Sequence, residues 1–160
     1  MRQTLLFAFF FSILNVFAQP DNQQLERALY DLPDVSFTNA TKPGDPYLTY
    51  DIMVKQPLDH QHPEKGSFYQ WVQLKHKGFN LPVVMETHGY GMGRGGNEVE
   101  QILNANNIGV EYRFFGKSKP DSLQWEYLRI EQAAADLHAI NQLFKQLYKG
   151  KWFSTGISKG

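Results

Sequence analysis

A serine between two glycines could act as a nucleophile. Residues Gly156-Ile157-Ser158-Lys159-Gly160 have the Gly-x-Ser-x-Gly spacing of a nucleophile elbow, in which the serine sits on a tight turn between a strand and a helix. The glycines matter because side chains two positions either side of the serine would collide. Such a turn lifts the Ser158 hydroxyl above the edge of a sheet, where it can attack a carbonyl carbon. A glycine-rich turn without chemistry is the alternative.

A second glycine-rich segment could stabilise the negative charge of such an attack. His88-Gly89-Tyr90-Gly91-Met92-Gly93 directly follows an apolar run. An alkoxide needs two preorganised backbone N–H donors, and we assign them to Tyr90 and Lys159, the residue after the nucleophile. A flexible surface turn or a phosphate-binding loop are the alternatives. The Lys and Thr of a P-loop are missing, and the glycines do not open directly into a helix.

The elements that would position these segments follow from the hydrophobic periodicity. Alternation over residues 47–54 and 68–74 predicts an antiparallel pair, and the apolar runs at 81–87 and 108–112 predict strands covered on both faces. An apolar stripe from Ile130 to Leu147 predicts a helix of about twenty residues, ended by Gly150 in a left-handed cap. Residues 152–155 read as a last buried strand. The sheet is therefore mixed, antiparallel at its start and parallel afterwards.

The amino terminus has the pattern of an export signal. Arg2 precedes an apolar run over residues 5–16, and small residues stand at Val16 and Ala18, where a signal peptidase would cleave. The run is too short to span a ~30 Å hydrocarbon core. We therefore divide the chain into a signal peptide at 1–18, an amino-terminal extension at 19–46 and a catalytic region at 47–160. The expected location is secreted or periplasmic.

Composition excludes several classes of protein. Sixteen Lys and Arg balance sixteen Asp and Glu, which argues against nucleic acid or an anionic membrane as a partner. The chain has no cysteine, which excludes disulfide scaffolds, thiol catalysis and thiolate metal sites. An apolar fraction of 42% is enough for a packed core. No metal and no organic cofactor is implied, and nothing indicates an oligomeric state.

Several blocks taken together resemble the secreted tripeptidyl-aminopeptidase family of serine peptidases, which is related to prolylcarboxypeptidase and dipeptidyl peptidase II. The resemblance extends over about residues 47–160, and the blocks are QPLDH at 56–60, THGYG at 87–91, VEYRFFGKS at 110–118, WEYL at 125–128, EQAAAD at 131–136 and STGISKG at 154–160. It implies an α/β-hydrolase fold with a helical cap, export, and removal of short peptides from free amino termini. By position, Ser158 matches the family's nucleophile.

The resemblance also implies an acid and a histidine downstream of the nucleophile. The α/β-hydrolase order is Ser, then Asp or Glu, then His, whereas all five histidines precede Ser158. None of them is therefore expected to be the general base; they are His60, His62, His76, His88 and His138. His60 and His62 are predicted to be solvated loop residues, because no third metal ligand is apparent. His138 is predicted to be a surface or packing residue.

Carboxylates could hold the ammonium group of a peptide substrate. The sequence offers four candidates without ranking them, which are Glu86, Glu98, Glu100 and Glu111. Glu111 lies two residues before Arg113, so their side chains share a face of a strand. A structural ion pair between them is favoured over a contact with substrate.

These residues predict an exported serine peptidase of α/β-hydrolase fold that acts on peptides with free amino termini, represented here by its amino-terminal part. Ser158 would form the acyl-enzyme, and residues 1–160 alone would be inactive without the acid and the base. One alternative is a secreted esterase or lipase, since the elbow and the oxyanion loop serve any acyl transfer. Another is a non-catalytic binding domain that has lost the triad.

Overall fold

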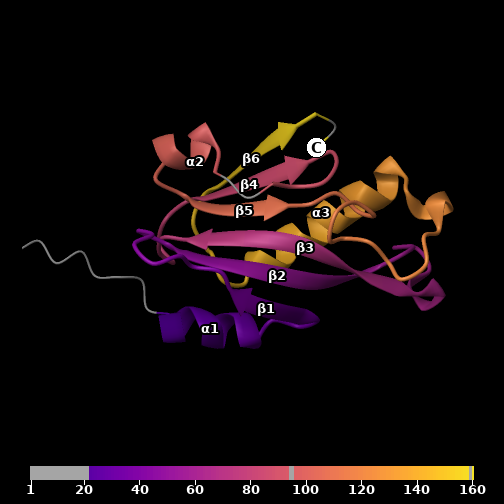
Figure 1. The fold of residues 1–160 in the computed structure, drawn as a ribbon, viewed down its shortest axis with the longest axis horizontal. Helices are drawn as coiled ribbons and strands as arrows, with labels where there is room; N and C mark the ends of the chain where they lie inside the picture. Colours follow the sequence, from indigo (N-terminus) through magenta and orange to yellow (C-terminus); the bar gives the residue numbers. More distant parts are fainter. Residues whose placement is uncertain (1–21, 94–95, 159) are drawn as a thin grey trace, which may run out of the picture.

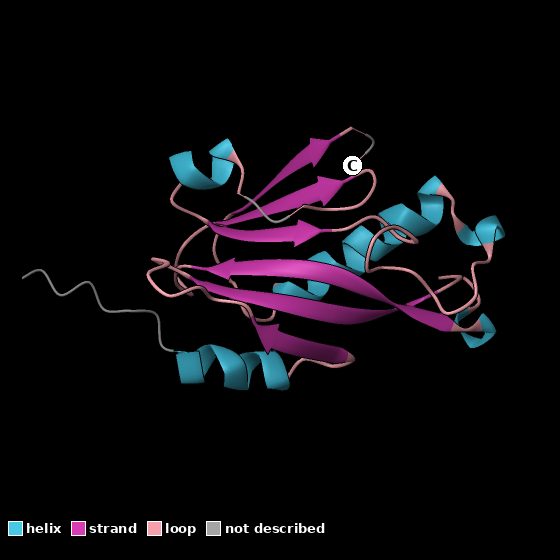
Figure 2. Ribbon diagram, in the orientation of Figure 1, coloured by secondary structure: helices cyan, strands magenta, loops and turns pink. Residues whose placement is uncertain are grey.

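A six-stranded sheet forms the centre of the molecule, drawn in magenta in Figure 2. The computed structural model describes residues 22–93, 96–158 and 160. Its helices are α1 (Asn22–Tyr30), α2 (Glu98–Ile102) and α3 (Ile130–Phe144), with short 3-10 turns at Pro63–Lys65 and Trp125–Tyr127. Its strands are β1 (Val35–Asn39), β2 (Leu48–Pro57), β3 (Ser67–His76), β4 (Val83–His88), β5 (Asn106–Val110) and β6 (Trp152–Ile157). Figure 1 shows the sheet with α3 behind it and α1 beside β1.

The sheet is mixed, as predicted. Its order is β1-β2-β3-β5-β4-β6, in which β1, β2, β3 and β5 pair antiparallel and β4 pairs parallel with both β5 and β6. The expected antiparallel pair is β2 and β3, whose register runs from Leu48 opposite His76 to Pro57 opposite Ser67. The parallel strands are linked through α2 and α3, as crossover connections require.

One face of this sheet carries the apolar core. Side chains of the central strands pack with α1 and α3 in a single cluster of buried residues, among them Leu25, Leu29, Tyr50, Ile52, Leu74, Ile108, Ile140 and Phe144. The opposite face of β3, β4 and β5 carries polar residues instead, including Gln73, Glu86 and Asn107. The strands at 81–87 and 108–112 were predicted to be covered on both faces, and this is confirmed: all of β5 and the first five residues of β4 are buried. One of the two covered faces is polar, which the apolar runs did not indicate.

The segment before residue 47 contributes to the same core. Leu25 and Leu29 lie four residues apart on one side of α1, and both are fully buried. Strand β1 was not predicted; it adds to β2 from Val35 opposite Val54 to Asn39 opposite Tyr50. The expected signal peptide lies outside the described residues. Among the residues that are described, no helix is long and apolar enough to cross a membrane.

Helix α3 is shorter than its apolar stripe suggested. It ends at Phe144, and the N–H groups of Leu147 and Tyr148 both donate to the Phe144 carbonyl in a tightened turn. This turn keeps Tyr148 buried, so the stripe continues past the helix itself. The predicted left-handed cap at Gly150 is wrong, because its φ is not positive.

Strand β6 forms where predicted but is not a buried strand. Among the described residues it pairs only with β4, and it lies at the edge of the sheet. Phe153 is 41% exposed as a consequence. The short apolar run at 152–155 has the pattern of an interior strand, because a sequence does not show how many neighbouring strands it pairs with.

A buried arginine joins the sheet to α3. Arg113 has no exposed surface, and its guanidinium binds both carboxylate oxygens of Asp136, with Nε to Oδ2 at 2.7 Å and Nη2 to Oδ1 at 3.1 Å. It also donates to the carbonyl oxygens of Pro57, Leu58 and Tyr127. Arg113 therefore connects the end of β2, the turn before α3 and α3 itself.

A buried histidine makes the stability depend on pH. His76 is 1% exposed, its Nδ1 lies 2.8 Å from the Tyr148 hydroxyl, and burial lowers its pKa to about 4 from 6.5. Below about pH 6.5 the unfolded chain binds a proton that the folded chain does not. The free energy of unfolding should therefore fall between about pH 6.5 and pH 4, by on the order of 3 kcal/mol. Denaturant unfolding followed by tryptophan fluorescence at several pH values measures this, and His76→Gln should flatten the profile over that window. An unchanged profile in the variant would contradict the assignment to His76.

Candidate active site

Ser158 lies on a strained turn directly after β6. Its φ is +63°, a left-handed conformation that residues other than glycine rarely adopt, and the residue is exposed. The flanking glycines are needed at close approach. A Cβ atom at Gly156 would overlap the Gly160 carbonyl and lie 3.3 Å from Thr87 Oγ1, and one at Gly160 would overlap the Thr87 carbonyl. The described residues of the Gly-x-Ser-x-Gly segment thus have the left-handed serine and the close approach at both glycines that a tight turn requires.

Parallel pairing places this turn beside the glycine-rich loop. Thr87 lies opposite Gly156 and His88 opposite Ile157, so β4 and β6 end at the same edge of the sheet. Residues 89–93 leave β4 at that edge, where Figure 1 also shows the end of β6. The structure therefore brings the Ser158 turn and the predicted oxyanion loop together.

The glycine-rich loop after β4 is held by contacts with the segment that follows β5. The Tyr90 carbonyl accepts a hydrogen bond from the Tyr112 N–H at 3.2 Å, and the Tyr90 ring meets the Phe115 ring edge-on at 5.2 Å. The N–H of Met92 donates to Glu111 Oε1 at 3.0 Å. Tyr90 thus lies on the loop that leaves β4 at the Ser158 edge of the sheet, whereas Lys159, the other residue assigned as a donor, lies outside the described residues.

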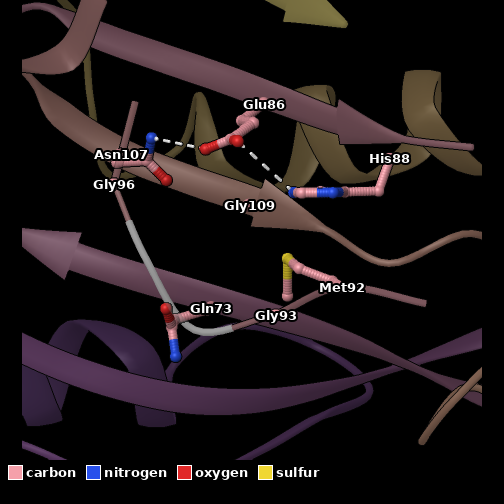
Figure 3. A pocket seen from close by; sticks show the side chains of 8 residues that line it. All are labelled: Gln73, Glu86, His88, Met92, Gly93, Gly96, Asn107 and Gly109. Carbon is pink, nitrogen blue, oxygen red and sulfur yellow. Dashed lines mark hydrogen bonds and ion pairs between the residues drawn. The ribbon is translucent and has the colours of Figure 1, made fainter. Parts of the chain in front are cut away.

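A cavity of about 180 Å³ lies beneath the loop on the polar face of the sheet (Figure 3). Its lining combines the loop with three strands, and the residues are Gln73, Glu86, His88, Met92, Gly93, Gly96, Asn107 and Gly109. Glu86 Oε2 accepts from Asn97 Nδ2 at 2.9 Å and Asn107 Nδ2 at 3.2 Å. Its Oε1 lies 3.5 Å from His88 Nε2.

The structure separates the four candidate carboxylates. Glu86 lines this cavity, and Glu98 is exposed on α2. Glu100 is buried at the amino-terminal end of the parallel strands, where it pairs with Lys75 at 3.5 Å and Lys77 at 3.1 Å. Glu111 is bound by backbone N–H groups.

The expected ion pair between Glu111 and Arg113 does not form. Arg113 pairs with Asp136, and Glu111 accepts from Met92, Lys117 and Ser118. β5 ends at Val110, so the alternation that would place the two side chains on one face no longer applies. Sequence reasoning missed both roles. The signal available was two charged residues next to an apolar strand, which indicates burial but not the partners.

The histidines are distributed around the sheet. His76 is buried under Tyr148, and His138 is exposed on α3, as one of its two expected placements. His62 is exposed, as expected of a loop residue. His60 is not simply solvated, because its Nε2 lies 2.7 Å from Asp136 Oδ1. Within the described ranges, no three His, Asp or Glu side chains converge as a metal site would need.

The sequence matches a known peptidase family. The family described as PS-10 peptidase S37 matches residues 18–160. The chain belongs to this family. It is 37% identical over 131 residues to the prolyl tri/tetrapeptidyl aminopeptidase of Streptomyces mobaraensis, covering 81% of this chain and 27% of that relative. The resemblance to tripeptidyl-aminopeptidases is therefore confirmed, and the chain spans about a quarter of the relative's length.

Solved structures identify the fold. Acetyl xylan esterase 1 from Thermoanaerobacterium sp. JW/SL YS485 superposes with a TM-score of 0.52 at 12% identity, over 86% of this chain and 50% of the esterase. At that identity the likeness concerns the fold alone. Together with the antiparallel-then-parallel sheet, it confirms the α/β-hydrolase fold for this member of the S37 family.

Replacing Gly156 should damage the turn around Ser158. In Gly156→Ala the new Cβ would meet backbone, which cannot move aside as a flexible side chain can. We expect a loss of stability of about 1–3 kcal/mol and slower labelling of Ser158 by a fluorophosphonate. Thermal unfolding and the labelling rate of the protein expressed from its complete gene measure these effects. Gly78→Ala is the matched control, because its Cβ would make only ordinary 3.7 Å contacts with Leu81. Equal behaviour of the two variants would contradict the close approach at Gly156.

Proposed function

We propose that this chain carries the nucleophile and the oxyanion loop of a secreted serine aminopeptidase that releases short peptides, tripeptides foremost, from free amino termini. The observation that carries the proposal is Ser158 at φ +63°, on an exposed turn that contacts the end of β4 where the Tyr90 loop begins. The S37 family match and the aminopeptidase relative support peptide bonds as the substrate.

In the proposed reaction, Ser158 Oγ attacks the carbonyl carbon of the scissile peptide bond as a general base takes the hydroxyl proton. The electron pair of the C=O moves to oxygen, and the N–H groups of Tyr90 and Lys159 bind that oxyanion. Collapse breaks the C–N bond, and the amine leaves with the proton from the base. Water then hydrolyses the acyl-enzyme and frees Ser158.

The base and the acid that orients it are proposed to come from sequence beyond Gly160, as the α/β-hydrolase order requires. The positions of two of the histidines support this assignment. His76 is buried away from the turn, and His60 is engaged with Asp136. Residues 1–160 alone are therefore proposed to be inactive, and activity is tested on the protein expressed from its complete gene.

Replacing the nucleophile should abolish the chemistry without unfolding the protein. Ser158→Ala removes one hydroxyl from an exposed turn, so we expect no fluorophosphonate labelling and a fall in turnover of about four orders of magnitude or more. Unblocked tri- and tetrapeptide amides with and without proline are suitable substrates, because the Streptomyces relative is named for prolyl tri- and tetrapeptides.

Ser154→Ala is the matched control for this experiment. Ser154 is an exposed serine of β6, four residues before the nucleophile, and its loss should leave labelling and turnover unchanged. Labelling that persists in Ser158→Ala would assign the chemistry to another serine. Hydrolysis of acetyl esters without any hydrolysis of peptide amides would favour an esterase, and absence of both in the complete protein would favour a binding domain.

Export is proposed from the amino-terminal pattern. We expect the secreted protein to begin at or within one or two residues of Gln19, because a signal peptidase reads the small residues at Val16 and Ala18. Amino-terminal sequencing of the secreted form measures this. Ala18→Arg should block cleavage and leave a longer form with the cells. Intact Met1 on protein from the soluble cytoplasmic fraction would argue against export.

A further inference from the structure

Glu111 is the most heavily hydrogen-bonded carboxylate near the Ser158 turn. It follows β5 directly, and only 1% of its surface is exposed. Oε1 accepts from the Met92 N–H at 3.0 Å. Oε2 accepts from the Lys117 N–H at 2.8 Å, the Ser118 N–H at 2.9 Å and the Ser118 hydroxyl at 2.8 Å. Such charge-assisted hydrogen bonds are stronger than bonds between neutral groups, so they offset the cost of burying the carboxylate.

These donors belong to two different segments. Met92 lies in the glycine-rich loop, two residues after Tyr90, whereas Lys117 and Ser118 close the turn over residues 114–118. The Ser118 hydroxyl also accepts from the Trp71 N–H at 2.9 Å, which attaches this turn to β3. Glu111 therefore links the loop to a turn that is itself fixed to the sheet.

The turn is shaped around the carboxylate. Phe114 and Gly116 have φ values of +69° and +46°, and a Cβ atom at Gly116 would overlap the Glu111 carboxylate. This left-handed backbone conformation is unfavourable for most residues. Here it is held in place by hydrogen bonds to Glu111 and between Phe114 and Ser118. Strain of this kind persists only where the surroundings determine the backbone.

We propose that Glu111 is a positioning residue for catalysis, which holds the Tyr90 loop in the geometry that binds the oxyanion. The two peptide units after Tyr90 are fixed by the hydrogen bonds from Tyr112 N–H to Tyr90 O and from Met92 N–H to Glu111. The Tyr90 N–H belongs to the peptide unit just before these two. Its orientation is therefore restricted on the carboxyl-terminal side of Tyr90. This inference rests on the proposed function and assigns the glutamate a role away from the substrate.

The test uses Glu111→Gln in the protein expressed from its complete gene. An amide can accept on one atom only, so its NH₂ group would face backbone N–H donors and loosen one of the two segments. We expect kcat to fall about 10- to 100-fold with KM changed by less than about threefold, since the lost geometry matters in the transition state. Hydrolysis of an unblocked tripeptide amide measures both constants.

A tripeptide aldehyde separates positioning from general damage. Ser158 would add to the aldehyde carbon, and the resulting oxygen would occupy the oxyanion site. The inhibition constant of the aldehyde should therefore rise by about the same factor as kcat falls. Binding of the free tripeptide product should be little changed. Parent-like kcat and aldehyde affinity in Glu111→Gln would overturn the inference.

Two further variants keep the outcome decisive. Glu100→Gln is the matched control, a second buried glutamate, placed at the other end of the parallel strands and bound to Lys75 and Lys77. It should lower the melting temperature without changing kcat, and an equal loss of kcat there would overturn the inference. If Glu111→Gln does not fold, Ser118→Ala tests the inference instead, because it removes one hydrogen bond to Glu111. We then expect kcat to fall about 3- to 10-fold and the aldehyde to bind more weakly. Turnover that survives Ser158→Ala would instead refute the proposed function itself.

Discussion

The buried Arg113 guanidinium is the constraint on which the arrangement of the other elements depends. Its pairing with Asp136 and its bonds to three carbonyl groups bring the end of β2, the turn before α3 and α3 to one point. A charge without any exposed surface is tolerated only where every donor finds an acceptor, and here the acceptors come from segments far apart in sequence. Docking of α3 on the sheet and burial of Arg113 therefore occur together.

The neighbouring Asp59 extends this network. Burial alone would raise the pKa of Asp59, but hydrogen bonds from Lys65, the Gln61 N–H and Gln132 lower it to about 2. The side-chain oxygen Oε1 of Gln132 in turn accepts a hydrogen bond from the backbone N–H of His60. The QPLDH block that suggested a family resemblance is thus a turn that binds α3, and its residues are structural in this fold.

Sequence patterns predicted the elements better than their environments. The alternation in β2 and β3 and the Gly-x-Ser-x-Gly turn led to the correct sheet and the correct strained serine. Strand β1 was missed because it is a five-residue strand at the sheet edge with no fully buried residue, which leaves no strong hydrophobic period. The partners of Glu111 and Arg113 were missed because spacing indicates which residues share a face and nothing about groups 23 residues away, such as Asp136.

The short segment after β5 shows how stability and chemistry are joined in this fold. Arg113 binds α3 beneath the sheet, while Glu111, two residues earlier, binds the loop that follows β4. The Glu111 and Arg113 side chains can reach different partners because the backbone leaves the strand after Val110 and turns at Phe114. A preorganised site needs side chains whose positions are fixed by their surroundings. The buried Arg113 fixes the backbone two residues after Glu111 and so restricts the position of Glu111. The glycine-rich loop after β4 thereby depends on the packing of α3, although α3 contributes no residue to it.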